Sequence, residues 1–268
     1  MLATAVLSQG VQAQGSSSIA DSVFGNKHLI SFGGARQTAD AFIRATAGDL
    51  DPVSLSLDDL GIDDRDETFY IEYRYRASEK WTLLAGAYTF TGTGSRTAER
   101  DFNYDGVDFT VGTAIRAELG IDAYIADALY RVYQSDNLEI DLGLGVHALD
   151  LSASIRADLS IGDVNASESF AGTTLLAPVP NFRGAATWML GERVGLRFVG
   201  GWLSANIDDY EGGFTYAHIR GFYSFNENFG VSLGYQLTDV DIKENRERSV
   251  VEYDVALEGP TVTLTLSF

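Results

Sequence analysis

The sequence predicts an all-β fold in which the chain crosses a membrane as a closed, antiparallel, up-and-down β-barrel. Residues 259–268 alternate strictly, with Val262, Leu264, Leu266 and Phe268 on one face and hydroxyl side chains on the other, as the two-residue period of a strand requires. The chain nowhere holds the roughly 18 consecutive apolar residues that a transmembrane helix needs. Short polar connections and longer charged ones follow one another in turn, which is typical of barrels that span a membrane.

Alternation along the rest of the chain predicts ten strands. Tight polar connections lie between apolar or aromatic runs, as hairpin turns do, at 78–80, 134–137, 191–193 and 226–228. If both termini lie on the same side as these four turns, the strand number is even, as is expected for a closed barrel made from one chain. Eight strands is the alternative if the first segment and one hairpin are misread. The predicted spans are 28–46, 67–77, 81–97, 107–133, 138–158, 179–190, 194–207, 213–225, 229–242 and 250–268.

The amino terminus divides into two short segments ahead of the barrel. Residues 1–13 hold a short apolar run followed by Val11-Gln12-Ala13, which is similar to the end of a secretory signal peptide without its basic beginning. Residues 14–27 are expected to form a periplasmic lead, and the barrel occupies 28–268. The alternative is a disordered amino terminus without a targeting role.

Charged residues decide which face of each strand meets lipid. In the second strand Phe69, Ile71 and Tyr73 alternate with Glu72 and Arg74, and an arginine facing lipid at the bilayer midplane costs about 2–4 kcal/mol. The charged face must therefore point into the lumen. The same argument gives a set of inward residues that we name the lumen charge network: Glu72, Arg74, Arg76, Asp127, Arg131, Glu139, Asp141, His147, Arg183, Arg197, His218 and Arg220.

Two strands fit this pattern only with a shift of parity. Asp127 and Arg131 point inward if the fourth strand shifts near Ala123, and the last strand shifts between Leu257 and Val262, around Gly259-Pro260. A β-bulge with one extra residue is expected at each place, because a bulge changes the face of the residues that follow and accepts proline.

The final strand and its terminal Phe268 resemble the closing strand of bacterial outer-membrane β-barrels. The resemblance is to the class of small OmpA/OmpX-like, porin-type barrels of Gram-negative bacteria and implies no particular activity. It implies an outer-membrane location, lipid and lipopolysaccharide as neighbours, and Phe268 as the signal that the barrel-assembly machinery reads. A monomer is the default. An edge strand of a soluble sandwich is the alternative for this segment.

Composition excludes two classes of function. A formal net charge of −19 lacks the basic surface that phosphate binding requires, so nucleic acid is not an expected partner. The absence of cysteine removes disulfides and thiolate metal sites.

A barrel of eight to ten strands encloses little more than its own side chains, so the lumen charge network is expected to form a paired polar plug. The resulting hypothesis is a barrel with a structural or surface-interaction role. The alternative is a narrow passive channel for ions or small solutes, in which the inward arginines select what passes.

A third hypothesis is an enzyme at the outer rim. Omptin-type proteases are similar ten-stranded barrels with acidic and Asp–His pairs at the rim, and only Asp208, Asp209 and His218 come near that arrangement. Lipid A deacylases use a Ser–His pair, and neither His147 nor His218 has a nucleophile beside it in sequence. With three histidines and no motif, no catalytic residues are assigned and no enzymatic activity is expected.

One segment is similar to half of a calcium loop. Asp101, Asn103 and Asp105 place oxygen side chains at alternate positions, and Asp108 could join them. The position of the bidentate glutamate holds Gly112 instead, which excludes an EF-hand. A looser surface Ca²⁺ site and a solvated turn are the two alternatives; no other metal or cofactor is expected.

Overall fold

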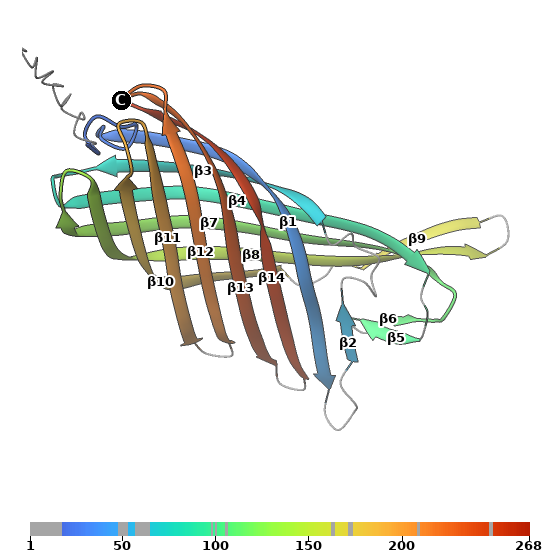
Figure 1. Cartoon of the computed structure of the whole chain (residues 1–268). Coiled ribbons are helices and arrows are strands. Elements are labelled where there is room, and N and C mark those ends of the chain that lie inside the picture. The colour runs from blue at the N-terminus through green and yellow to red at the C-terminus, as the bar shows by residue number, and fades with distance from the viewer. Residues whose placement is uncertain are drawn as a thin grey trace, which may run out of the picture.

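The structure is a computed structural model that describes residues 18–47, 53–56, 65–97, 99, 101–104, 107–161, 164–170, 174–207, 210–246 and 249–268. Within these residues, ten long strands form a closed antiparallel barrel (Figure 1). Neighbours along the chain pair with each other, and the first long strand also pairs with the last, for example Phe32 with Leu264. The predicted fold class and the predicted strand number are therefore confirmed.

The barrel strands agree with the predicted spans to within a few residues over most of the chain. Their bounds are β1 His28–Ala47, β3 Arg65–Arg76, β4 Trp81–Thr97, β7 Ala114–Gln134, β8 Leu138–Ile161, β10 Thr174–Met189, β11 Val194–Ile207, β12 Tyr210–Ser224, β13 Phe229–Arg246 and β14 Ser249–Ser267. The long connections contain short strands, namely β2 Val53–Ser56, β5 Phe102–Tyr104, β6 Val107–Phe109 and β9 Val164–Phe170.

The start predicted for the fourth long strand, residue 107, is wrong. Val107–Phe109 instead pairs with Phe102–Tyr104 in a separate small hairpin. Gly112 then turns the chain with a φ of 89°, a left-handed conformation that glycine adopts without strain. The long strand β7 begins only after this turn, at Ala114.

The outward face of the barrel is a belt of large apolar side chains. Phe69, Leu144 and Leu233 are 61%, 68% and 65% exposed, respectively. Exposed apolar surface of this extent marks contact with lipid or with another protein, and a ring of it around a closed barrel is typical of a membrane span. The described residues contain no helix long and apolar enough to cross a membrane.

Both predicted parity shifts are wrong. In β7, Ile121, Ala123, Asp127 and Arg131 all face inward with one continuous alternation, and the register shifts only later, between Arg131 and Tyr133. β14 also keeps its register against β13 through the Gly259-Pro260 step. The reason is that apolar side chains occupy part of the lumen, so an apolar residue does not always mark the lipid face.

Leu257 and Ile121 belong to this apolar part of the lumen. They are 2% and 4% exposed, and Phe90, Val240 and Val255 are buried with them. These residues lie farther from the short turns than the charged ones do. The lumen therefore has a charged half near the termini and a more apolar half toward the long connections.

Residues 18–27, which we name the mouth segment, close the short-turn end of the barrel. Val23 and Phe24 are 1% and 3% exposed and pack with Leu29, Met189 and Phe222. Backbone bonds hold the segment in place, among them Ile19 N–H to the carbonyl of Asp136 at 2.9 Å. This segment is the described part of the predicted periplasmic lead; residues 14–17 and the predicted signal peptide, 1–13, lie outside the described residues.

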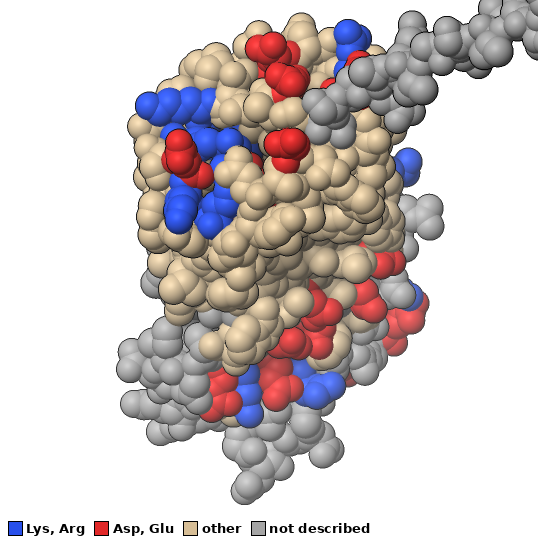
Figure 2. Space-filling view, turned by 60° about the vertical axis from the view of Figure 1, so that its left-hand side comes forward, with Lys and Arg blue, Asp and Glu red and all other residues tan. Residues whose placement is uncertain are grey.

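Charge is distributed unevenly along the barrel axis. On the face shown in Figure 2, Lys and Arg side chains gather in a hollow at the upper, short-turn end, whereas Asp and Glu predominate toward the lower end. Asp241 and Asp254 lie directly opposite each other on β13 and β14. Asp254 is separated from Phe268 by more than the nine to eleven residues that a strand needs to cross the bilayer, so it lies beyond the membrane-spanning part of β14. Partial desolvation, then the carboxylates of Asp241, Asp239 and Asp40, raise the pKa of Asp254 above its usual value.

Candidate functional site in the lumen

The structure brings the residues of the lumen charge network together inside the barrel. Nine of them are at most 6% exposed: Arg74, Asp127, Arg131, Glu139, Asp141, His147, Arg183, Arg197 and Arg220. The other three, Glu72, Arg76 and His218, are half-buried. The network draws on six strands, β3, β7, β8, β10, β11 and β12, so its side chains meet across the lumen rather than along one strand.

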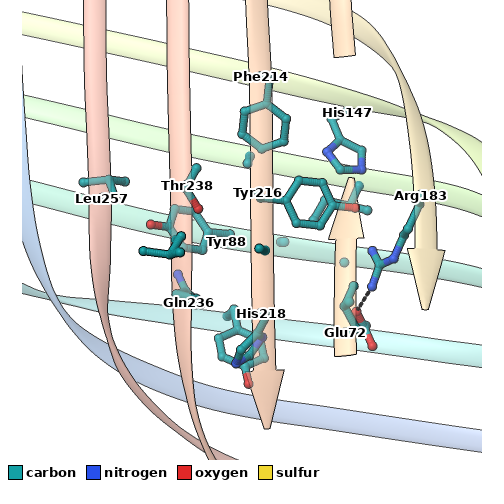
Figure 3. Close-up of a pocket in the computed structure, with 18 of the residues that line it drawn as sticks. Glu72, Tyr88, His147, Arg183, Phe214, Tyr216, His218, Gln236, Thr238 and Leu257 are labelled. Carbon is teal, nitrogen blue, oxygen red and sulfur yellow. Dashed lines mark hydrogen bonds and ion pairs between the residues drawn. The ribbon is translucent and has the colours of Figure 1, made fainter. Parts of the chain in front are cut away.

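Arg183 lies at the centre of the first cluster. Its Nη1 donates to Asp127 Oδ2 at 2.8 Å. Its Nη2 donates to Glu72 Oε2 at 2.9 Å (Figure 3). These two bonds join β10 to β7 and β3 across the barrel. Gly145 makes room for this contact, because a Cβ at that position would overlap the carboxylate of Asp127.

A second cluster lies nearer the short turns, around Glu139. Its Oε1 is 2.5 Å from Arg131 Nη2 and 3.2 Å from Arg76 Nη2. Arg131 also donates from Nε to Asp141 at 3.3 Å and from Nη1 to the carbonyl of Glu79 at 2.8 Å. Buried carboxylates with paired arginines satisfy the condition under which charge is tolerated in a low-dielectric interior.

Three buried arginines form no ion pair with a carboxylate in the described part of the chain. Arg74 donates from Nη2 to the carbonyl of Phe24 at 2.8 Å, and Arg197 from Nη1 to the hydroxyl of Thr187 at 2.6 Å. In the described residues, the one hydrogen bond seen for Arg220 runs from its Nη1 to the hydroxyl of Tyr70, at 3.5 Å. Arg197 and Arg220 are directly opposed on β11 and β12, where like charges repel.

The two lumen histidines have different surroundings. His147 Nε2 is 3.2 Å from Asp127 Oδ1 and 3.1 Å from Asn181 Nδ2. His218 Nε2 is 2.9 Å from Thr261 Oγ1, and no hydrogen bond to an orienting carboxylate is seen for His218 among the described residues. A nucleophile needs a base that a third group orients, so the Thr–His pair does not form a triad. Asp208 and Asp209 lie outside the described residues.

The calcium-like segment is described only in part. Asp101 is exposed, and its Oδ1 accepts a hydrogen bond from the backbone N–H of Val111 at 2.6 Å. Asn103 and Asp108 pair across the small hairpin, and Asp105 lies outside the described residues. Among the side chains that the structure describes, no group of three or more acidic, His or Cys residues could hold a metal ion, so the Ca²⁺ site stays a prediction.

A cavity of about 140 Å³ lies in the lumen beside the Arg183 cluster (Figure 3). We name it the lumen cavity. Its wall combines polar groups with apolar ones, and includes Tyr70, Tyr88, Tyr216, His218, Arg220, Ile121, Ile125, Val199, Val240 and Leu257. The sequence reasoning missed the aromatic and apolar members. The available signal was parity, since Tyr70 lies two residues from Glu72 on the same face of β3.

Comparison with protein-family models finds no match, and no curated protein matches the sequence. Among solved structures, the outer membrane protease OmpT from Escherichia coli matches with a TM-score of 0.57 and 11% identity, over 90% of this chain and 97% of that one. The translocator domain of the autotransporter NalP from Neisseria meningitidis matches with a TM-score of 0.45 and 9% identity, over 91% and 89%. The toluene transporter TbuX of Ralstonia pickettii matches with a TM-score of 0.38 and 12% identity, over 94% and 92%.

The fold is therefore that of a small bacterial outer-membrane β-barrel, as the sequence predicts. The similarity to OmpT concerns the arrangement of strands, because 11% identity shows the fold alone and fold does not determine activity. The two weaker matches carry no argument about function.

Proposed function

We propose that this protein is an integral barrel of the Gram-negative outer membrane whose lumen is sealed, with a structural or surface-interaction role. The observation that carries the proposal is the bond from Arg74 Nη2 to the carbonyl of Phe24 at 2.8 Å. It ties the lumen charge network to the mouth segment, so side chains and backbone close the same end of the barrel together.

The seal has two layers. The guanidinium groups of Arg74 and Arg197 lie 5.6 Å and 5.2 Å from the ring centroid of Phe24, which places an aromatic ring directly beneath buried cations. Beyond that ring, Arg183 links Asp127 and Glu72 across the lumen. An ion crossing the barrel would have to displace the ring and then break these pairs, at a cost of several kcal/mol for each buried charge.

The apolar belt supports the proposed location. Outer-membrane lipid, with lipopolysaccharide in the outer leaflet, would cover the exposed side chains of residues such as Phe69 and Leu144. Phe268 is 63% exposed at the end of β14, where we propose that the barrel-assembly machinery reads it. We propose a monomer, with lipid covering the outer face. The proposal includes no enzymatic activity and no resident cofactor.

A narrow passive channel is the competing function. It would need an open path lined by the inward arginines, but Arg183 and Arg131 are each paired with carboxylates, and Arg74 is held by the mouth segment. The geometry therefore favours the sealed barrel over the channel.

Ion flux into vesicles tests the proposal. The refolded chain would be inserted into vesicles that hold a chloride-sensitive dye, after a heat-dependent gel shift has shown that the barrel formed. The sealed barrel predicts dye quenching at the rate of protein-free vesicles. Fast quenching by the folded protein would overturn the proposal and favour the channel. A variant without residues 18–27 serves as the comparison, because the proposal predicts faster flux once the outer layer of the seal is removed.

A further inference from the structure

Arg220 is a buried cation at the wall of the lumen cavity without a carboxylate partner in the described part of the chain. It is 5% exposed, its Nε has no hydrogen-bond partner among the residues that the structure describes, and its Nη1 is 3.5 Å from the hydroxyl of Tyr70. That hydroxyl is itself hydrogen-bonded to Thr263 Oγ1. A buried guanidinium with so few partners is costly unless an anion joins it.

The lumen charge network as a whole also carries an excess of positive charge. Six arginines face four carboxylates, which leaves an excess of two positive charges: Arg74, Arg76, Arg131, Arg183, Arg197 and Arg220 against Glu72, Asp127, Glu139 and Asp141. Glu72 also lines the cavity and interacts electrostatically with Arg220, but its Oε2 accepts from Arg183 at 2.9 Å, and no ion pair between Glu72 and Arg220 is seen in the described residues. Opposite Arg220 on the next strand is another cation, Arg197. Two of the three arginines for which the described residues show no ion pair, Arg197 and Arg220, therefore lie side by side on β11 and β12.

One part of the cavity wall is apolar. Ile121, Val199, Val240 and Leu257 are at most 6% exposed and line the space together with Ile125. A volume of about 140 Å³ is close to that of an apolar cavity that holds one benzene molecule, about 150 Å³. A ligand that fits this cavity has one compact apolar group and one anionic group.

We propose that the lumen cavity binds a small monocarboxylate whose apolar group is about the size of a benzene ring. The carboxylate accepts hydrogen bonds from Arg220, because the planar guanidinium matches a carboxylate with two parallel donors. The apolar group lies against Ile121, Val240 and Leu257. His218 also lines the cavity, but its Nε2 is already hydrogen-bonded to Thr261 Oγ1. This site goes beyond the sealed barrel, which needs no ligand.

Titration with benzoate tests the proposal on the full chain, refolded in a neutral detergent. Isothermal titration calorimetry would compare benzoate with benzamide, which has the same shape without the charge, and with acetate, which lacks the ring. We expect benzoate to bind at least tenfold more tightly than either. Equal affinity for benzoate and benzamide, or no benzoate binding to the folded barrel, would overturn the proposal.

Variants separate the cation from the apolar wall. Arg220→Gln should weaken benzoate binding at least tenfold and leave benzamide binding unchanged, and Ala123→Leu should weaken benzoate binding by filling the cavity that Ala123 lines. Arg193→Gln, at an exposed turn, is the matched control and should bind benzoate as the parent does. Unchanged benzoate affinity in Arg220→Gln, or an equal loss in Arg193→Gln, would contradict the assignment. Each variant must first show the heat-dependent gel shift of a folded barrel.

Discussion

Arg183 is the residue whose removal should weaken the barrel most. It is 3% exposed and pairs with two carboxylates at once, Asp127 and Glu72. Arg183→Gln keeps much of the side-chain volume but removes the charge, so Asp127, whose side chain is 0% exposed, loses its arginine. Removing one partner of a buried pair costs about 3–5 kcal/mol. Glu72 is 15% exposed on its side chain, so solvent screens part of its loss, and we expect about 3 kcal/mol in total.

Urea unfolding of the refolded protein in lipid vesicles measures this loss. The slope of the free energy of unfolding against urea concentration must be the same for the variant and the parent. Arg193→Gln, at an exposed turn, is the control and should change the free energy of unfolding by less than about 0.5 kcal/mol. Arg183→Lys should fall between the two, because one ammonium group lacks the fork that reaches both carboxylates. A loss below about 1 kcal/mol for Arg183→Gln would refute the view that these pairs hold the lumen together.

Four further changes test other parts of the structure. Arg220→Gln should leave the free energy of unfolding unchanged or raise it, since it removes the repulsion with Arg197 and breaks no ion pair seen in the described part of the chain; a loss above about 2 kcal/mol would contradict this. Leu144→Arg, on the lipid face, should cost about 2–4 kcal/mol in vesicles, and a loss close to zero would place Leu144 outside the bilayer. Phe24→Ala should cost about 3 kcal/mol as a buried aromatic truncation and speed proteolysis of the mouth segment. Asp254→Asn should stabilise the barrel at neutral pH, because the raised pKa of Asp254 means that its ionised form opposes folding. That advantage should shrink as the pH falls through the raised pKa toward the usual aspartate range, and a constant advantage would exclude this cause.

The barrel could be predicted from the sequence because its strands obey a simple alternation. β3 places Phe69 and Ile71 outside and Glu72 and Arg74 inside, and lipid forbids the opposite choice. Four short polar connections then set the strand order, and the first and last strands meet as closure requires. Local pattern and membrane physics point to the same answer over most of the chain.

The apolar part of the lumen could not be predicted in the same way. Ile121 and Leu257 have the side chains of lipid-facing residues, yet they are buried inside, and the sequence alone does not separate two apolar environments. The expected bulges near Ala123 and at Pro260 were a consequence of this ambiguity. Only the register across neighbouring strands resolves it.

The mouth segment and the lumen cavity depend on contacts between distant residues. Phe24 meets Arg74 and Arg197, which lie 50 and 173 positions further along the chain. No local pattern around Phe24 predicts such partners, because the segment has neither alternation nor a motif. Charged residues could be assigned to the lumen one strand at a time, whereas their pairing needed the closed barrel.

Single-channel conductance of the refolded protein in a planar bilayer tests the sealed lumen most directly. The barrel must first show its heat-dependent gel shift, so that silence is not mistaken for failure to fold. A sealed lumen predicts no conductance steps above the bare bilayer from the intact chain. Steady steps whose size rises with salt concentration would contradict it and identify the lumen arginines as the lining of an open channel.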